Sequence, residues 1–171
     1  MQKFIIIFSL LVIIGCKKDK NEKNFNDDLL KGRCRVWCDV KGAVSSNYQS
    51  DDYYSFSAYN LAQMSLAGVY INNSTSIRED VTLSFPVSIT AGSYNLSSSL
   101  SPNITFTYLK KNVYAYDDKI WTAGIGSYFT VNITKVSYTE IEGTFVGAAT
   151  NSVDGTTINV TNGKFRTEFS H

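Results

Sequence analysis

Strict alternation of apolar and polar side chains, repeated in short runs along most of this chain, is the feature that most limits its fold. Val81, Leu83 and Phe85 are separated by single polar residues, and 104–108 repeats the pattern. A period of two places the apolar side chains on one face of a β-strand. Turn-forming residues recur about every eight to twelve positions, which is typical of sandwiches and barrels. We therefore expect an all-β domain over 32–171, either an antiparallel β-sandwich or a partly closed barrel of about ten strands.

Two dipeptides near the C-terminal end predict hairpin turns. Asn162–Gly163 and Asp154–Gly155 are both preferred in two-residue hairpin loops. Pairing around the first puts Val160 opposite Phe165, and pairing around the second puts Ala149 opposite Val160. Both registers agree with the local alternation of apolar residues. Together they predict one inward-facing set: Ile141, Gly143, Phe145, Gly147, Ala149, Ile158, Val160, Phe165 and Phe169.

The region around Cys34 and Cys38 is predicted to be a strand with one apolar face. The two cysteines share a parity with Val36 and Val40, whereas Arg33, Arg35, Trp37 and Asp39 form a mostly polar face. Four residues of strand span about 13 Å, and a disulfide needs Cα atoms within about 7 Å. We therefore expect two buried thiols that do not bridge.

The first sixteen residues have the pattern of a bacterial lipoprotein signal. Lys3 supplies a positive charge, Phe4–Ile14 is an apolar run of eleven residues, and Gly15 precedes Cys16. A membrane-spanning helix needs about 20 apolar residues, so a cleaved signal peptide is the better interpretation. Residues 1–15 are predicted to be removed, leaving Cys16 as the lipidated N-terminus.

The segment that follows the lipidation site is polar and of mixed charge. Residues 16–31 contain almost nothing to bury, so we expect the lipidated cysteine to continue into a disordered tether. The chain has 16 Lys and Arg against 15 Asp and Glu, and removal of Lys3 balances these charges. A balanced chain has no basic excess to neutralise phosphates, so we expect no nucleic-acid partner.

Motifs for catalysis and for cofactors are missing from the sequence. The single histidine is the last residue, His171, where chain ends are loosely held. The adjacent acidic pairs Asp51–Asp52, Glu79–Asp80 and Asp117–Asp118 are expected to lie in turns. A weak calcium site or a glycosidase-like carboxylate pair are the alternatives. We expect no catalytic residue, no metal and no cofactor.

The segment around Asp117 and Asp118 predicts the best candidate for a ligand site. If these aspartates form a turn, Tyr114 falls opposite Trp121, and Tyr116 shares their face. Flat aromatic side chains beside carboxylates can hold sugar rings through apolar contact and hydrogen bonds. A cross-strand aromatic pair that only stabilises a hairpin is the alternative. Tyr53, Tyr54 and Tyr59 form a second aromatic cluster, which leaves the same two interpretations open.

Several segments of the chain resemble the small Bacteroidota lipoproteins that carry an all-β domain of unknown function. The segments that carry this resemblance are Gly15–Cys16, Val40–Gly42, Ala91–Leu96, Ile141–Phe145 and Val160–Phe165. The resemblance implies a β architecture and a lipid anchor in the bacterial cell envelope. With Lys17 in the second mature position it implies the outer membrane, on either its periplasmic or its outer face.

These features together predict a membrane-anchored envelope lipoprotein. Its β domain is expected to be a non-catalytic binding or accessory module for a glycan or a partner protein. A structural or inhibitory lipoprotein that acts by protein–protein contact is the alternative. The membrane contact itself is expected to run through the N-terminal lipid on Cys16.

Overall fold

The computed structural model describes Phe25, Asp28, Leu29 and residues 32–115 and 117–169. Within this part of the chain every regular element is a strand, and no helix is long and apolar enough to cross a membrane. The strands are β1 (Arg33–Gly42), β2 (Ser46–Gln49), β3 (Phe56–Tyr59), β4 (Gln63–Asn72), β5 (Ile77–Pro86), β6 (Gly92–Asn95), β7 (Thr105–Asn112), β8 (Lys119–Ala123), β9 (Phe129–Val136), β10 (Glu140–Thr150) and β11 (Thr157–Glu168).

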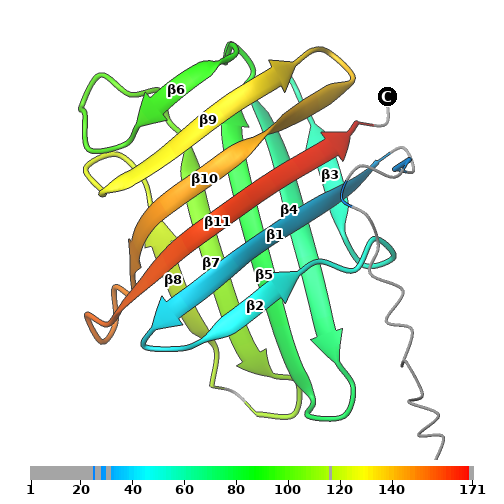
Figure 1. The fold of residues 1–171 in the computed structure, drawn as a ribbon, viewed down its shortest axis with the longest axis vertical. Coiled ribbons are helices and arrows are strands. Elements are labelled where there is room, and N and C mark those ends of the chain that lie inside the picture. The colour runs from blue at the N-terminus through cyan, green and yellow to red at the C-terminus, as the bar shows by residue number, and fades with distance from the viewer. Residues whose placement is uncertain (1–24, 26–27, 30–31, 116, 170–171) are drawn as a thin grey trace, which may run out of the picture.

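All eleven strands belong to one antiparallel sheet that curls into a half-barrel. The order is β2-β1-β11-β10-β8-β7-β5-β4-β3, and β9 also pairs with β10 and carries β6 at its outer edge. Figure 1 shows the consequence: a front layer of β6, β9, β10, β11, β1 and β2 crosses a back layer of β8, β7, β5, β4 and β3. The prediction of an antiparallel all-β fold is confirmed. A half-barrel made from one sheet combines features of the two architectures that the sequence left open.

The two layers are joined differently on their two sides. On one side β10 passes from β9 to β8, which it meets at Thr150 and Thr122. On the other side the segment 50–55 connects β1 to β4 through serine side chains. The Ser50 hydroxyl accepts a hydrogen bond from the Val36 amide at 2.9 Å, and the Ser55 hydroxyl accepts one from the Val69 amide at 3.0 Å. These hydroxyls satisfy backbone donors that would otherwise be buried without a partner.

The core between the layers is rich in phenylalanine. Phe106 stacks on Phe129 with ring centroids 4.7 Å apart, and Phe85 lies 5.4 Å from Phe165. Phe145 connects the two pairs, because its ring lies 6.1 Å from Phe129 and 6.3 Å from Phe165. Each ring is essentially inaccessible to solvent. Aromatic side chains bury large apolar areas, so this cluster holds the front layer against the back layer.

The C-terminal strands correct the predicted hairpins. Asn162 and Gly163 are not a turn: they lie inside β11 as a β-bulge, where the pairing with β10 shifts between Phe145 and Gly147. Asn162 has a left-handed φ of 54°, the conformation that both a bulge and a hairpin turn require. Asn162 therefore has the left-handed backbone conformation that a hairpin turn would require, but it has it in a bulge within β11.

The second predicted turn exists, with a different register. The loop between β10 and β11 contains Asp154 and Gly155, but Ala149 pairs with Ile158 rather than with Val160. The loop is longer than two residues, because Asn151 donates a hydrogen bond to the Thr156 carbonyl at its base. The predicted inward set is nevertheless buried, apart from the half-buried Gly147, because the bulge shifts the alternation as a hairpin would.

The predicted face of β1 is confirmed, and two residues of the predicted tether differ from the expectation that it holds almost nothing to bury. Cys34 and Cys38 are buried and unbridged on the inner face. In the predicted tether, Phe25 and Leu29 are buried, while Asp28 is exposed. Burial of these two apolar side chains means that the folded part of the chain begins before residue 32. The signal peptide over residues 1–15 and the lipidated Cys16 lie outside the described residues.

Candidate ligand-binding site

The predicted aromatic site does not form. Trp121 on β8 pairs with Tyr108 rather than with Tyr114, and only 1% of it is exposed. Its indole Nε1 donates a hydrogen bond to the Thr156 hydroxyl at 3.1 Å. Tyr114 lies in the loop between β7 and β8 and is 86% exposed, so the two rings lie in different environments.

The turn chemistry explains why the register differs. Asn112 starts the connection, because its side-chain oxygen accepts a hydrogen bond from the Tyr114 amide at 3.0 Å and its carbonyl accepts one from Ala115. The loop therefore begins several residues before Asp117 and Asp118, which are both exposed in it. Tyr116 is not among the described residues.

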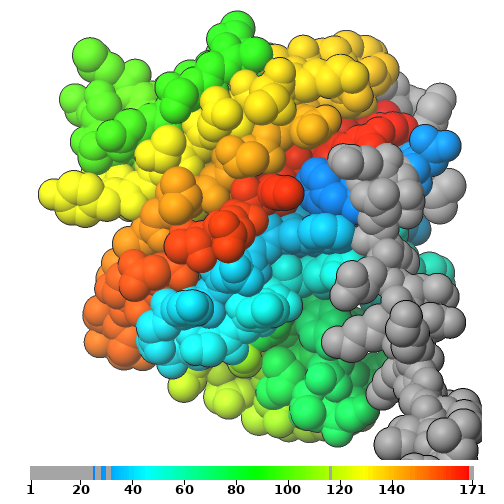
Figure 2. Space-filling view, in the orientation of Figure 1, coloured from blue at the N-terminus to red at the C-terminus, as the bar shows by residue number. Residues whose placement is uncertain are grey.

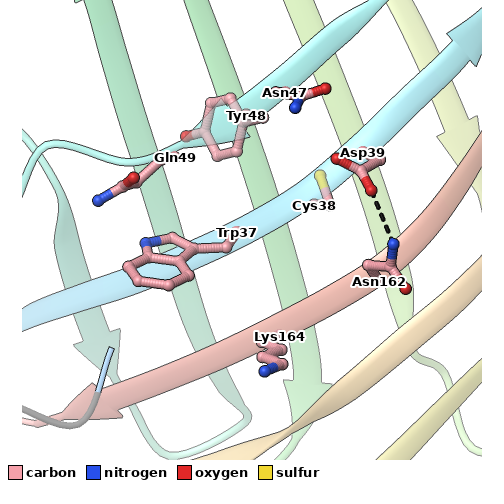
Figure 3. Close-up of a pocket in the computed structure, with 8 residues that line it drawn as sticks. All are labelled: Trp37, Cys38, Asp39, Asn47, Tyr48, Gln49, Asn162 and Lys164. Carbon is pink, nitrogen blue, oxygen red and sulfur yellow. Dashed lines mark hydrogen bonds between the residues drawn. The ribbon is translucent and has the colours of Figure 1, made fainter. Parts of the chain in front are cut away.

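A depression with a volume of about 280 Å³ lies on the outer face of the front layer (Figure 3). It is lined by Trp37 and Asp39 of β1, Asn47 and Gln49 of β2, and Asn162 and Lys164 of β11, with Cys38 and Tyr48 beneath them. Cys38 and Tyr48 alternate with the outward residues and are buried in the core. The depression is therefore a feature of the solvent-facing side of the sheet.

Strand register brings the outward side chains together. Trp37 lies directly between Gln49 on β2 and Lys164 on β11, as Figure 3 shows. Asp39, two residues further along β1, pairs with Asn47. Side chains opposite one another on neighbouring strands are about 5 Å apart at Cβ. Gln49 and Lys164 thus flank Trp37 on its two neighbouring strands, and Asp39 and Asn47 lie two residues further along.

The bulge in β11 contributes the next polar group. In the left-handed conformation Asn162 projects its amide toward β1, where Nδ2 donates a hydrogen bond to Asp39 Oδ2 at 2.7 Å (Figure 3). Bulges often re-aim a side chain next to a functional site. Here the bulge fixes the Asp39 carboxylate beside the half-buried Trp37.

The chemistry of the depression suits a neutral polar ligand. Asn47, Gln49 and Asn162 each offer donors and acceptors, and the one carboxylate and the one ammonium group balance in charge. The indole adds a flat apolar surface with a polar edge. Glycosidases typically use two carboxylates, and Asp39 is the single carboxylate among the residues that line this depression.

A family model described as "Domain of unknown function (DUF6252)" matches residues 48–167. The chain belongs to this family. No curated protein and no solved structure matches the chain. The matched residues of the DUF6252 domain include Asn162 and Lys164, whereas β1, with Trp37 and Asp39, precedes them.

The segment before the DUF6252 domain packs beside the depression. Phe25 meets the indole of Trp37 edge-on, with ring centroids 5.2 Å apart. The buried guanidinium of Arg35 forms a 2.7 Å ion pair with Asp52 and donates a 3.4 Å hydrogen bond to the Phe25 carbonyl. The hydrogen bond from Arg35 holds Phe25 in place against the indole of Trp37.

A second polar cluster lies between the layers of the DUF6252 domain, and it corrects the predicted turn at Glu79–Asp80. Both residues are inside β5, and Glu79 is only 4% exposed. Its carboxylate accepts hydrogen bonds from Tyr108 at 2.9 Å and Ser46 at 2.7 Å, and Lys110 lies 2.8 Å away. Burial, followed by the charge of Glu79, raises the pKa of Tyr108. This satisfied network connects β2 to β5 and β7, which is a structural role.

The two buried thiols of β1, which precede the DUF6252 domain, are poor nucleophiles and poor metal ligands. Burial raises the pKa of Cys34 and of Cys38 from 9.0 to about 12, so both thiols are protonated at neutral pH. Among the described residues no group of three His, Cys, Asp or Glu side chains could hold a metal ion.

Sequence reasoning missed most of this site for a physical reason. Alternation placed Trp37 and Asp39 on the polar face of β1, and a tryptophan on such a face was the available signal. Gln49, Asn162 and Lys164 come from other strands, and the pairing of β1 with β11 joins segments more than one hundred residues apart. No local pattern records that pairing.

Proposed function

We propose that this protein is a lipid-anchored binding protein of the bacterial cell envelope, whose β domain holds a neutral glycan without catalysis. One observation carries the glycan proposal: Trp37 lies between Gln49 and Lys164, next to the hydrogen-bonded pair Asp39–Asn162. A sugar ring has an apolar face of C–H groups and a rim of hydroxyls. The indole matches the apolar face, and amide and carboxylate groups match the hydroxyls.

The anchor belongs to the same proposal and rests on residues 1–16. The apolar run that ends in Gly15 and Cys16 supports a lipoprotein signal, as does the resemblance to small Bacteroidota lipoproteins. Several acyl chains on one cysteine give a stable attachment, since each buried methylene contributes about 0.8 kcal/mol. Cys16→Ser should move the protein from the membrane fraction to the soluble fraction. Unchanged membrane association would exclude this anchor.

The glycan proposal is tested with the full chain, purified in detergent, on an array of neutral and acidic glycans. We expect retention of neutral glycans, lost in Trp37→Ala and kept in Tyr114→Ala. Tyr114 is a matched control because it is an exposed aromatic residue away from the depression. Circular dichroism should show both variants folded. Equal retention by the two variants would exclude Trp37 as the binding platform.

One surface favours the alternative of a protein partner. Tyr53, Tyr54 and Phe56 are 74%, 46% and 53% exposed, and the two tyrosine rings meet edge-on at 5.0 Å. Clustered exposed aromatic residues are typical of protein contacts. A photo-crosslinker at position 53 should then capture one defined envelope protein that the same crosslinker at position 114 does not.

A further inference from the structure

Outward side chains of the front layer line up in two rows that cross six strands. The pairing partners of Trp37 continue in register from β2 to β6, giving a first row of Gln49, Trp37, Lys164, Thr144, Asn132 and Ser93. The second row begins with Asn47 and Asp39, crosses the bulge at Asn162, and continues through Val146, Thr130 and Asn95. Both rows run across the strands rather than along them.

The rows contain a second depression that adjoins the first. Its volume is about 660 Å³, and Thr130, Asn132, Thr144 and Val146 line it. Asn162 and Lys164 line both depressions. Figure 2 shows the face on which they lie, a broad surface that runs from β6 through β9, β10 and β11 to β1 and β2. The Trp37 depression is thus one end of a longer surface.

The length of this surface limits its ligand. Neighbouring strands are about 4.8 Å apart, so six strands span about 24 Å between the first and the last. A single sugar would contact only one of the two depressions. A ligand that uses both must be an extended chain that lies perpendicular to the strands.

The charge of the rows limits the ligand further. Their hydroxyl and amide groups are accompanied by one acid, Asp39, and one base, Lys164. A row of charged residues borders them, since Arg35 pairs with Arg166 and Arg166 with Glu142. A polyanion would need a cluster of cations, which these two rows lack. The balanced rows match an uncharged chain.

A peptide is a poor fit for the same surface. Extended peptides bind by adding to an exposed strand edge through backbone hydrogen bonds. The two depressions lie over the middle of the sheet, where β1, β11 and β10 are each paired on both sides. Recognition here must come from side chains, which suits a ligand with hydroxyl groups along its whole length.

From these observations we infer that the front layer binds a linear, uncharged polysaccharide, laid across the strands from Trp37 to Asn132. The inference rests on the glycan-binding function proposed above and adds the class and direction of the ligand. Trp37 stacks against one sugar unit. Thr144 and Asn132 bind units further along the same chain.

Isothermal titration of the detergent-purified full chain with neutral oligosaccharides of two to six units tests this inference. The probes are β-1,4-glucan, β-1,4-xylan, β-1,4-mannan and α-1,4-glucan series. In at least one series we expect the affinity to rise at least tenfold from dimer to hexamer. Thr144→Ala combined with Asn132→Ala should reduce the hexamer affinity to that of the dimer and leave dimer binding unchanged. Trp37→Ala should weaken binding of both.

The matched control is Thr122→Ala combined with Asn73→Ala, since both residues are exposed and outside the two rows. It should bind all oligosaccharides as the unmodified protein does. Equal affinities for dimer and hexamer, with loss in Trp37→Ala, would overturn the extended site and leave the proposed function intact. Retention of acidic glycans alone on the array described above would overturn the uncharged class in both proposals. Absence of binding to every probe would overturn both proposals.

Discussion

Gly68 on β4 lies directly against Val36 on β1, so closely that no side chain fits between them. A β-carbon at Gly68 would be 2.9 Å from the Val36 Cβ and 2.9 Å from the Tyr48 hydroxyl oxygen. Both neighbours are buried, and the Val36 Cβ is attached directly to the backbone, so it cannot move aside without a shift of β1. On this side of the half-barrel, β1 and β4 therefore approach each other this closely because residue 68 has no side chain.

Gly68→Ala should destabilise the protein by about 1–3 kcal/mol, the usual cost of overpacking a core. Gly124→Ala is the control, because a β-carbon there would meet its nearest neighbours at 3.9 Å, an ordinary contact. Urea unfolding followed by circular dichroism measures both. Equal urea midpoints for the two variants would show that the layers can accommodate a methyl group at position 68 without loss of stability.

Trp121→Ala should cost about 3–5 kcal/mol, because it removes a buried indole and leaves a cavity. Tyr114→Ala should change stability by no more than about 0.5 kcal/mol, as expected for an exposed loop position. The same urea titration checks both. A Trp121→Ala variant with an unchanged midpoint would contradict the placement of this indole in the core.

Which side chains of each strand face the core could be predicted from the sequence, because the alternation of apolar and polar residues is a local property. The inward sides of β1, β10 and β11 follow directly from it, including the two buried cysteines. The register could not be predicted as well. Asn162–Gly163 fits a hairpin turn and a bulge equally, because both need a left-handed residue. Only the long-range pairing of β11 with β1 and β10 decides between them.

For the candidate site, too, the type of side chain could be predicted from the sequence but its position in the fold could not. The sequence predicted a ligand site of aromatic and acidic side chains and placed it around Tyr114 and Trp121. That placement assumed a turn at Asp117, whereas the Asn112 side chain starts the turn earlier. Closure at Gly68 has no sequence signature either, since a glycine within a strand does not indicate which other strand approaches it.

Asn162→Val should destabilise the protein by about 1–2 kcal/mol, because a β-branched residue is strained at the φ of 54°. Asn162→Gly should be nearly neutral in stability, since glycine adopts this conformation readily. Asn159→Val is the control, an exposed position on the same strand with regular pairing. Thermal unfolding measures all three.

Asn162→Val and Asn162→Gly also separate the backbone role of Asn162 from its side-chain role. Both remove the amide that holds Asp39, so both should weaken glycan binding by about tenfold, equivalent to one lost hydrogen bond. If Asn162→Gly bound glycan as well as the unmodified protein does, the bulge would contribute only its backbone shape and the Asn162 amide would not contribute to binding.

The buried thiols predict how stability responds to alkali. Cys34 and Cys38 have pKa values raised to about 12 by burial, against 9.0 in an exposed chain. Between pH 9 and 12 the unfolded chain loses these two protons while the native state keeps them. Stability contributed by the thiols is thus complete below pH 9 and falls as pH rises, by at most about 1.4 kcal/mol per pH unit for each thiol.

Urea unfolding under reducing conditions at intervals from pH 8 to pH 10.5 measures this slope. Cys34→Ala combined with Cys38→Ala should flatten it above pH 9, even though the smaller side chains lower the stability at every pH. The comparison therefore uses slopes rather than absolute free energies. Identical slopes for the two proteins would mean that other groups, such as the buried tyrosines, account for the alkaline loss and that the thiols titrate normally in the native state.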